Sequence, residues 1–271
     1  MILALLMAAQ AVAEPPAVPP ELTAEIGNTP APAPPDNNAA DALFDRKAMA
    51  RARAQLRKEN GGLTSHSVMF NLAEYQARAR SDGYRWEGTA RFGGDIDKLL
   101  IKSEGEGIFG GGLETAETQV VYSRAIDPYF DLHIGARYDI TPNPSRAYAV
   151  LGVEGLAPLW FDVEGQLFLS DKGDLLARVE ATYDQRITQK LVAQPRAELN
   201  LAAQDVRKNR IGSGISDLEL GLRVRYEVKQ EFAPYVGVEF VRAFGDTARF
   251  LRAKNDDASQ TNFVIGLQFW F

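Results

Sequence analysis

The sequence predicts an all-β fold: a transmembrane antiparallel β-barrel of about twelve strands, of the kind found in bacterial outer membranes. The first observation is the C-terminus, where apolar side chains occupy every other position from Phe263 to Phe271 and the last residue is aromatic. Such alternation indicates a strand with one apolar face. The second observation is that earlier segments repeat this alternation with charged residues on the other face. The third is the asymmetry of the connections between strands.

Twelve segments after residue 64 carry the strand pattern. In 217–228, for example, Leu, Val and Tyr residues share one side, while Glu219, Arg223 and Arg225 share the other. A soluble sandwich that buries its apolar face has the same alternation, so the pattern alone favours the barrel only modestly. The predicted strands are 67–80, 84–92, 98–107, 117–125, 129–140, 147–156, 160–170, 175–187, 190–203, 215–229, 232–244 and 261–271.

The lengths of the connections favour the barrel. One set is short, at 125–128, 156–159, 188–189 and 230–231. The other set includes long connections, at 110–116, 141–146, 204–214 and 245–260. Outer-membrane barrels have short periplasmic turns and longer outer loops, and an even strand number places both ends of the barrel on the periplasmic side. The register of the first and fourth strands is ambiguous, which predicts bulges at Glu74 and Arg124.

Three segments precede the barrel, which we assign to 65–271. Residues 1–13 are apolar and end in Ala-Val-Ala, which predicts a signal peptide with a truncated basic region. Residues 14–40 are rich in Pro and Ala and predict a disordered linker. Residues 41–60 carry apolar side chains at helical spacing among Arg and Lys residues, which predicts an amphipathic helix with Asp41 as its N-cap. The helix lies either at the barrel mouth or membrane surface, or free in solvent.

Composition excludes several classes of function. The chain has no cysteine, which excludes disulfides, zinc fingers and thiol catalysis. Its net charge is −6, which argues against nucleic acid as a partner. Some twelve-stranded barrels are lipases with Ser and His on the outer face, but His133 has no Ser two or four residues away and projects inward. We therefore expect a protein without enzymatic chemistry.

Long stretches of the chain resemble the copper resistance protein B family, and the resemblance covers roughly residues 41–271. It implies an outer-membrane protein of Gram-negative bacteria that moves or holds copper at that membrane. The implied partners are copper ions and outer-membrane lipid, together with a periplasmic multicopper oxidase or copper carrier. The matching stretches include 41–44 (DALF), 49–56 (MARARAQL), 102–105 (KSEG), 122–126 (YSRAI), 135–139 (GARYD), 155–158 (GLAP), 194–199 (QPRAEL) and 231–238 (EFAPYVGV).

Copper ligands are scarce in this chain. Many family members carry an N-terminal stretch rich in Met and His, but here that region is rich in Pro and Ala, and the whole chain has four Met and two His. His66 and Met69 lie where the chain enters the barrel, and His133 projects into the lumen. Imidazole and thioether groups suit copper. For each we weigh a metal site against the alternative of a packing or hydrogen-bonding role.

Alternation places more acids than bases on the lumen face, and an acidic lumen attracts cations. The alternative is that Arg and Glu residues fill a narrow barrel with structural ion pairs. The predicted cation path consists of Glu104, Asp131, Asp139, Glu154, Asp162, Glu164, Glu180, Asp184, Glu198 and Glu219.

We predict copper efflux or sequestration at the outer membrane, with copper bound weakly. Two other functions stay open at this point. One is a general channel for small cations or solutes. The other is a structural adaptor barrel that serves periplasmic copper proteins.

Overall fold

The computed structural model describes residues 38–60 and 63–271, so the predicted signal peptide and most of the predicted linker lie outside it. Two compact units divide at Gln55 and Leu56, and each is described by itself. The strands are β1 (Ser65–Ala77), β2 (Gly83–Gly93), β3 (Asp97–Ile108), β4 (Gly112–Ala125), β5 (Phe130–Thr141), β6 (Arg146–Ala157), β7 (Phe161–Ser170), β8 (Leu175–Tyr183), β9 (Gln185–Arg186), β10 (Leu191–Ala202), β11 (Gly214–Tyr226), β12 (Phe232–Ala243) and β13 (Ser259–Trp270).

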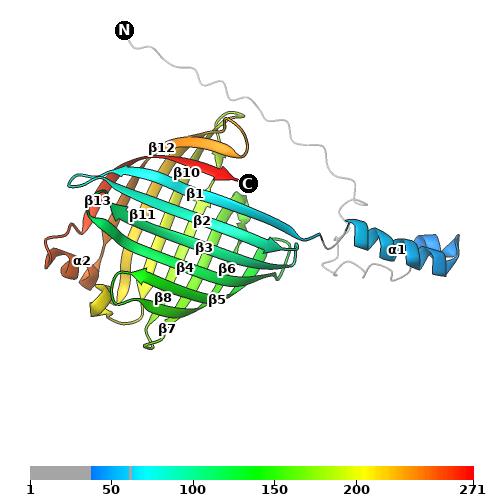
Figure 1. Ribbon diagram of the computed structural model, residues 1–271, viewed down its shortest axis with the longest axis horizontal. Coiled ribbons are helices and arrows are strands. Elements are labelled where there is room, and N and C mark those ends of the chain that lie inside the picture. Colours follow the sequence, from blue (N-terminus) through cyan, green and yellow to red (C-terminus); the bar gives the residue numbers. More distant parts are fainter. Residues whose placement is uncertain (1–37, 61–62) are drawn as a thin grey trace, which may run out of the picture. The chain divides into compact units, whose positions relative to one another are not determined.

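The strands form a closed antiparallel barrel of twelve strands, as predicted (Figure 1). Apart from β8 and β9, each strand pairs with the next strand along the chain, and β13 pairs with β1 to close the ring. The short β9 continues β8 after Asp184, because both pair with β10. Backbone hydrogen bonds join Val68 to Phe271, so the barrel begins and ends at one rim. We call this rim the terminal end and the opposite rim the loop end.

The loop end carries the two long connections, while every other connection is short. Residues 203–213, with η4 (Arg207–Asn209), join β10 to β11, and residues 244–258, with α2 (Gly245–Arg252), join β12 to β13. The predictions of long connections at 110–116 and 141–146 were wrong. Residues 112–116 belong to β4, and only 142–145 join β5 to β6. The helix α2 was not predicted from the sequence.

Bulges occur in the first and fourth strands, but not where the sequence predicted them. In β1 the extra residue is Asn71, between Phe70 and Leu72, and in β4 it is Glu114, between Leu113 and Thr115. A bulge adds one residue to a strand and therefore reverses which side chains face inward. After its bulge, β1 directs Glu74 into the lumen. Arg124 lies in continuous register and faces outward.

The first unit contains a short 3-10 helix, η2 (Ala39–Ala42), and the start of α1 (Arg46–Asn60). The prediction that Asp41 caps the helix was wrong, because Asp45 accepts a hydrogen bond from the Ala48 amide at 2.9 Å and α1 begins at Arg46. Asp41 instead accepts two hydrogen bonds from Arg53, at 2.6 and 3.0 Å, which lower the pKa of its carboxyl. Within the described residues, no helix has both the length and the apolar character needed to cross a membrane.

The two faces of the barrel wall differ in chemistry. Many large apolar side chains of the strands point outward and are exposed, for example Ile134, Leu151 and Phe263. The inner face carries charged and amide side chains. Many of them are buried inside the barrel. An apolar outer band with a polar interior is the arrangement of a barrel surrounded by lipid.

Candidate metal site in the barrel lumen

The lumen holds two cavities, one toward each rim. The terminal-end cavity has a volume of about 570 Å³, and its lining includes Met69, Trp160 and Gln268. The loop-end cavity has a volume of about 920 Å³ and reaches α2. Both cavities share Glu104, Glu117 and Arg178 in their linings. These three side chains therefore lie in the layer between the cavities.

Strand register brings six of the predicted acids into one continuous row. Each member lies directly opposite the next on the neighbouring strand. We call this set the carboxylate row. Because barrel strands tilt from the barrel axis, a row that crosses them at right angles also climbs along the lumen. Glu154, Glu164 and Glu180 line the terminal-end cavity, and Glu198 and Glu219 line the loop-end cavity. In order along the row, the members are Asp131 of β5, Glu154 of β6, Glu164 of β7, Glu180 of β8, Glu198 of β10 and Glu219 of β11.

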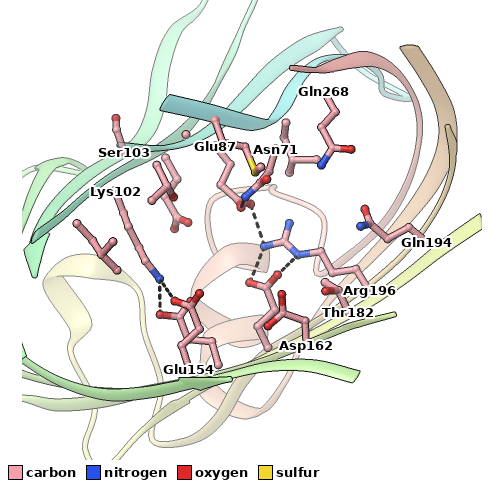
Figure 2. A pocket seen from close by; sticks show the side chains of 18 of the residues that line it. Asn71, Glu87, Lys102, Ser103, Glu154, Asp162, Thr182, Gln194, Arg196 and Gln268 are labelled. Atoms are coloured by element: carbon pink, nitrogen blue, oxygen red, sulfur yellow. Dashed lines mark hydrogen bonds and ion pairs between the residues drawn. The ribbon is translucent and has the colours of Figure 1, made fainter. Parts of the chain in front are cut away.

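Positive side chains compensate the charge of the row, because like charges directly opposite each other destabilise a sheet. At the start of the row the partners are lysines. Lys98 Nζ lies 2.5 Å from Asp131, and Lys102 Nζ lies 2.9 Å from Glu154 and 2.5 Å from Glu164. Figure 2 shows Lys102 reaching from one wall of the cavity toward the carboxylate of Glu154 on another.

Arginines hold the rest of the row, and each of them joins several acids. Arg196 donates to Glu180 at 2.8 and 2.9 Å and to Glu198 at 3.0 Å. Arg178 Nε lies 3.3 Å from Glu198, and Arg85 donates to Glu219 at 2.8 Å. These guanidinium groups also reach acids outside the row. Arg178 contacts Glu104 and Glu117, and Arg196 contacts Glu87 across the lumen (Figure 2).

His133 lies beside the lysine end of the row. It faces inward from β5, between Ser123 of β4 and Gly152 of β6, and its side chain is 1% exposed. Among the described residues, neither ring nitrogen has a hydrogen-bond partner. A buried polar atom without a partner is costly and calls for an explanation.

Two glutamates of the row approach the imidazole. Nε2 of His133 lies 3.7 Å from an oxygen of Glu154, and Nδ1 lies 3.6 Å from an oxygen of Glu164. These distances are too long for hydrogen bonds. A ring nitrogen and a carboxylate oxygen at such a separation can both bind one metal ion, which typically lies about 2 Å from each. Among the described residues, His133, Glu154 and Glu164 are the one group of three His, Asp or Glu side chains whose possible ligand atoms all lie within 4.8 Å of one another. One imidazole nitrogen and two carboxylates form a ligand set suited to Cu(II).

The other predicted acids of the cation path also point into the lumen. Glu104 accepts from Arg178 at 2.6 Å, and Asp139 accepts from Arg137 at 2.6 Å. Asp162 lines the terminal-end cavity, and Asp184 lies on the same cavity, bonded to Arg225. The alternation therefore assigned the inner face correctly at these positions. The ion pairs are the structural alternative that the sequence left open, and whether the acids also conduct cations stays a prediction.

The structure does not bring His66 and Met69 together. Both lie in β1 before its bulge, and their positions differ by an odd number of residues, so they occupy opposite faces of the strand. Met69 lines the terminal-end cavity, whereas His66 is exposed and is absent from both cavity linings. A joint site built from these two side chains therefore does not form in this arrangement.

Sequence reasoning missed two acids of the lumen network. Glu74 follows the bulge in β1 and Glu117 follows the bulge in β4, and these are the two strands whose register the sequence left ambiguous. Glu74 accepts two hydrogen bonds from Arg223, and Glu117 lies 2.5 Å from Arg137. Lys102 faces inward as the alternation of β3 requires, but its contact with two acids of the predicted path depends on which strands lie across the lumen. No local pattern reports that arrangement.

Comparison with known proteins shows which protein family this chain resembles. The family described as "Copper resistance protein B precursor (CopB)" matches residues 64–271. A curated "Copper resistance protein B homolog" from Pseudomonas syringae pv. tomato is 37% identical over 227 residues, which cover 84% of this chain and 76% of the relative. A "Copper resistance protein B" from Escherichia coli is 35% identical over the same shares of the two chains.

Among solved structures, the NanC porin has a similar fold. It aligns with a TM-score of 0.50 and 12% sequence identity, over 76% of this chain and 99% of the porin. Similarity at that level of identity concerns the fold alone, and it agrees with a barrel that spans the outer membrane.

Proposed function

Because the chain belongs to the copper resistance protein B family and folds as an outer-membrane β-barrel, we propose that it contributes to copper resistance by holding copper ions inside its lumen. The ligands in this proposal are His133, Glu154 and Glu164. The observation that carries it is the buried imidazole, whose two nitrogens have no hydrogen-bond partner among the described residues and face two carboxylates. Copper is the cargo here, and the proposal includes no enzymatic step.

The arrangement of the lumen supports sequestration more than free passage. A copper ion that enters the terminal-end cavity meets an excess of carboxylates, which attract cations. Farther along, Arg85, Arg178 and Arg196 join acids of opposite walls. A general channel for small cations or solutes fits these crosswise pairs less well. In the proposed topology the terminal end faces the periplasm, where a copper carrier or multicopper oxidase is the predicted protein partner.

The proposal is tested by Cu(II) titration of the purified full chain in detergent, in competition with a chelator of known affinity. His133→Ala should remove one copper site. His66→Ala is the matched control, because it deletes the other imidazole of the chain from the opposite face of the wall, and it should leave that site unchanged. Electron paramagnetic resonance of the bound Cu(II) should show nitrogen coupling that His133→Ala abolishes. If the two variants bind copper equally, the proposed site is wrong.

A further inference from the structure

A positive side chain of the protein already lies in the copper site. Lys102 Nζ donates to Glu154 at 2.9 Å and to Glu164 at 2.5 Å, and these are the two carboxylates that face His133. We propose that Lys102 is a displaceable counter-cation: it holds the two glutamates together in the copper-free barrel and leaves them when copper binds. This inference rests on the proposed function, because it concerns the regulation of that same site.

The two cations exclude each other for electrostatic and steric reasons. Glu154 and Glu164 lie directly opposite each other on β6 and β7, so without a positive partner they repel. The ammonium group lies within 3 Å of an oxygen of each. A Cu(II) ion bound to the same oxygens would stand within a few ångströms of that ammonium, where two positive charges repel strongly. Lys102 must therefore swing away for copper to bind.

The choice of lysine distinguishes this end of the row from the rest. Guanidinium groups hold Glu180 and Glu198 by several bonds in fixed planar geometry. Lysine instead presents a single point charge on a flexible four-carbon stem, so it gives up one position and takes another more readily. The cavity of about 570 Å³ offers the stem space. Glu104 lines the same cavity two residues farther along β3 and offers the ammonium another carboxylate.

Competition by Lys102 makes the copper site reversible. Each copper ion that binds must replace an ionic contact that already exists, so the net gain is smaller than the ligand set alone would provide. A divalent ion still adds one positive charge relative to the ammonium that it displaces. The lysine therefore weakens copper binding to a level at which the ion can be released again.

The test measures copper affinity after the ammonium group of Lys102 is removed. In chelator-competition titrations of the purified full chain, Lys102→Met should tighten the copper binding that depends on His133 by about tenfold or more. Lys98→Met is the matched control, because Lys98 lies on the same face of β3 and pairs with Asp131 instead. It removes an equal charge from the same lumen and should change affinity much less. Lys102→Arg should weaken binding, because a guanidinium grips both carboxylates.

Each outcome of the titration separates the two proposals. If binding depends on His133 but Lys102→Met leaves the affinity unchanged or lower, the counter-cation inference is wrong and the copper site stands. If Lys98→Met tightens binding equally, the effect is one of general lumen charge and the inference also fails. If neither wild type nor Lys102→Met binds copper through His133, both proposals fail.

A second measurement uses the unaltered protein, so it holds even if Lys102→Met does not fold. The Lys102 amine is labelled with a small water-soluble acylating reagent, and the modified peptide is quantified by mass spectrometry with and without Cu(II). Release of the ammonium from its two carboxylates should increase labelling of Lys102 several-fold, while labelling of Lys98 stays constant. Equal labelling of Lys102 with and without bound copper would overturn the inference.

Discussion

The start of the carboxylate row and its middle are held in different ways. At the start of the row, each lysine contributes one ammonium group to Asp131 or to the pair Glu154 and Glu164. In the middle, Arg196 alone contacts acids of three strands, and Arg178 does the same. The buried histidine lies only at the lysine end. We therefore infer that guanidinium groups fix the middle of the row, whereas the lysine end can exchange one cation for another.

This difference indicates that carboxylates in different parts of the lumen have different capacities to bind an incoming cation. A carboxylate held by several guanidinium bonds has little capacity left for an incoming ion, and removing its partner leaves a buried charge behind. A carboxylate held by one flexible ammonium can accept another cation in its place. An acidic lumen by itself does not predict where a cation binds. The identity of the basic partner does.

The largest effect is expected where the arginine part of the row is broken. Arg196→Met leaves Glu180 and Glu198 without their shared partner, and Arg196 and Glu198 are both nearly fully buried. We expect a loss of about 3–5 kcal/mol in the free energy of unfolding. Urea unfolding from lipid vesicles, followed by tryptophan fluorescence, measures it.

The matched variant at the other end is Lys98→Met, which removes a single contact near the rim. We expect it to cost about 1 kcal/mol or less, because it breaks one ion pair, and Asp131 is 23% exposed and keeps a hydrogen bond from Ser123. Equal losses for the two variants would contradict the distinction between a fastened middle and an exchangeable end.

An intermediate effect is expected on the passage of ions. Arg178 lies in the layer between the two cavities and contacts Glu104, Glu117 and Glu198 there. Arg178→Ser should raise the single-channel conductance of the barrel in planar bilayers several-fold, because it removes both bulk and positive charge from that layer. Arg124→Ser is the control, since Arg124 faces outward and is 60% exposed. If the conductance of the Arg178 variant matches that of wild type, another part of the lumen limits ion flow.

The smallest expected effect lies in the loop end, outside the barrel wall. The Ser213 amide donates to Asp205 at 2.8 Å, and this hydrogen bond lowers the pKa of the Asp205 carboxyl. Because the folded value lies below the unfolded one, the contribution of this carboxylate is complete above the ordinary aspartate pKa of about 3.9. It is lost as the pH falls through the lower folded value.

Amide hydrogen exchange of residues 203–213 measures that loss. Exchange should accelerate as the pH falls below about 4, after correction for the intrinsic rate. Asp205→Asn should remove most of this dependence, because its amide oxygen still accepts the bond and does not titrate. A loop whose corrected exchange is independent of pH in the wild type would show that this bond does not order it.

Much of the barrel was predictable because strands have a period of two. The alternation identified all twelve strands, with bounds within three residues except at the start of β4, and directed Glu104, Glu164 and Glu219 to the inside. It failed where the period is interrupted. One extra residue in β1 reverses the facing side chains before Glu74, and another in β4 precedes Glu117; the register of these two strands stayed ambiguous from the sequence, so both acids were missed. Bulges arise from pairing between strands, so a single strand's sequence reports them poorly.

By itself, the sequence determined the class of fold, the acidic inner face and the small number of copper ligands, because these follow from local alternation and from composition. Only the tertiary structure decided which of those ligands meet. Glu154 and Glu164 converge on His133 because three neighbouring strands adopt a particular register, and Lys102 reaches them because the closed ring brings β3 within reach of β6 and β7. Distances across a lumen depend on closure and register, which are properties of the whole ring and not of any single strand.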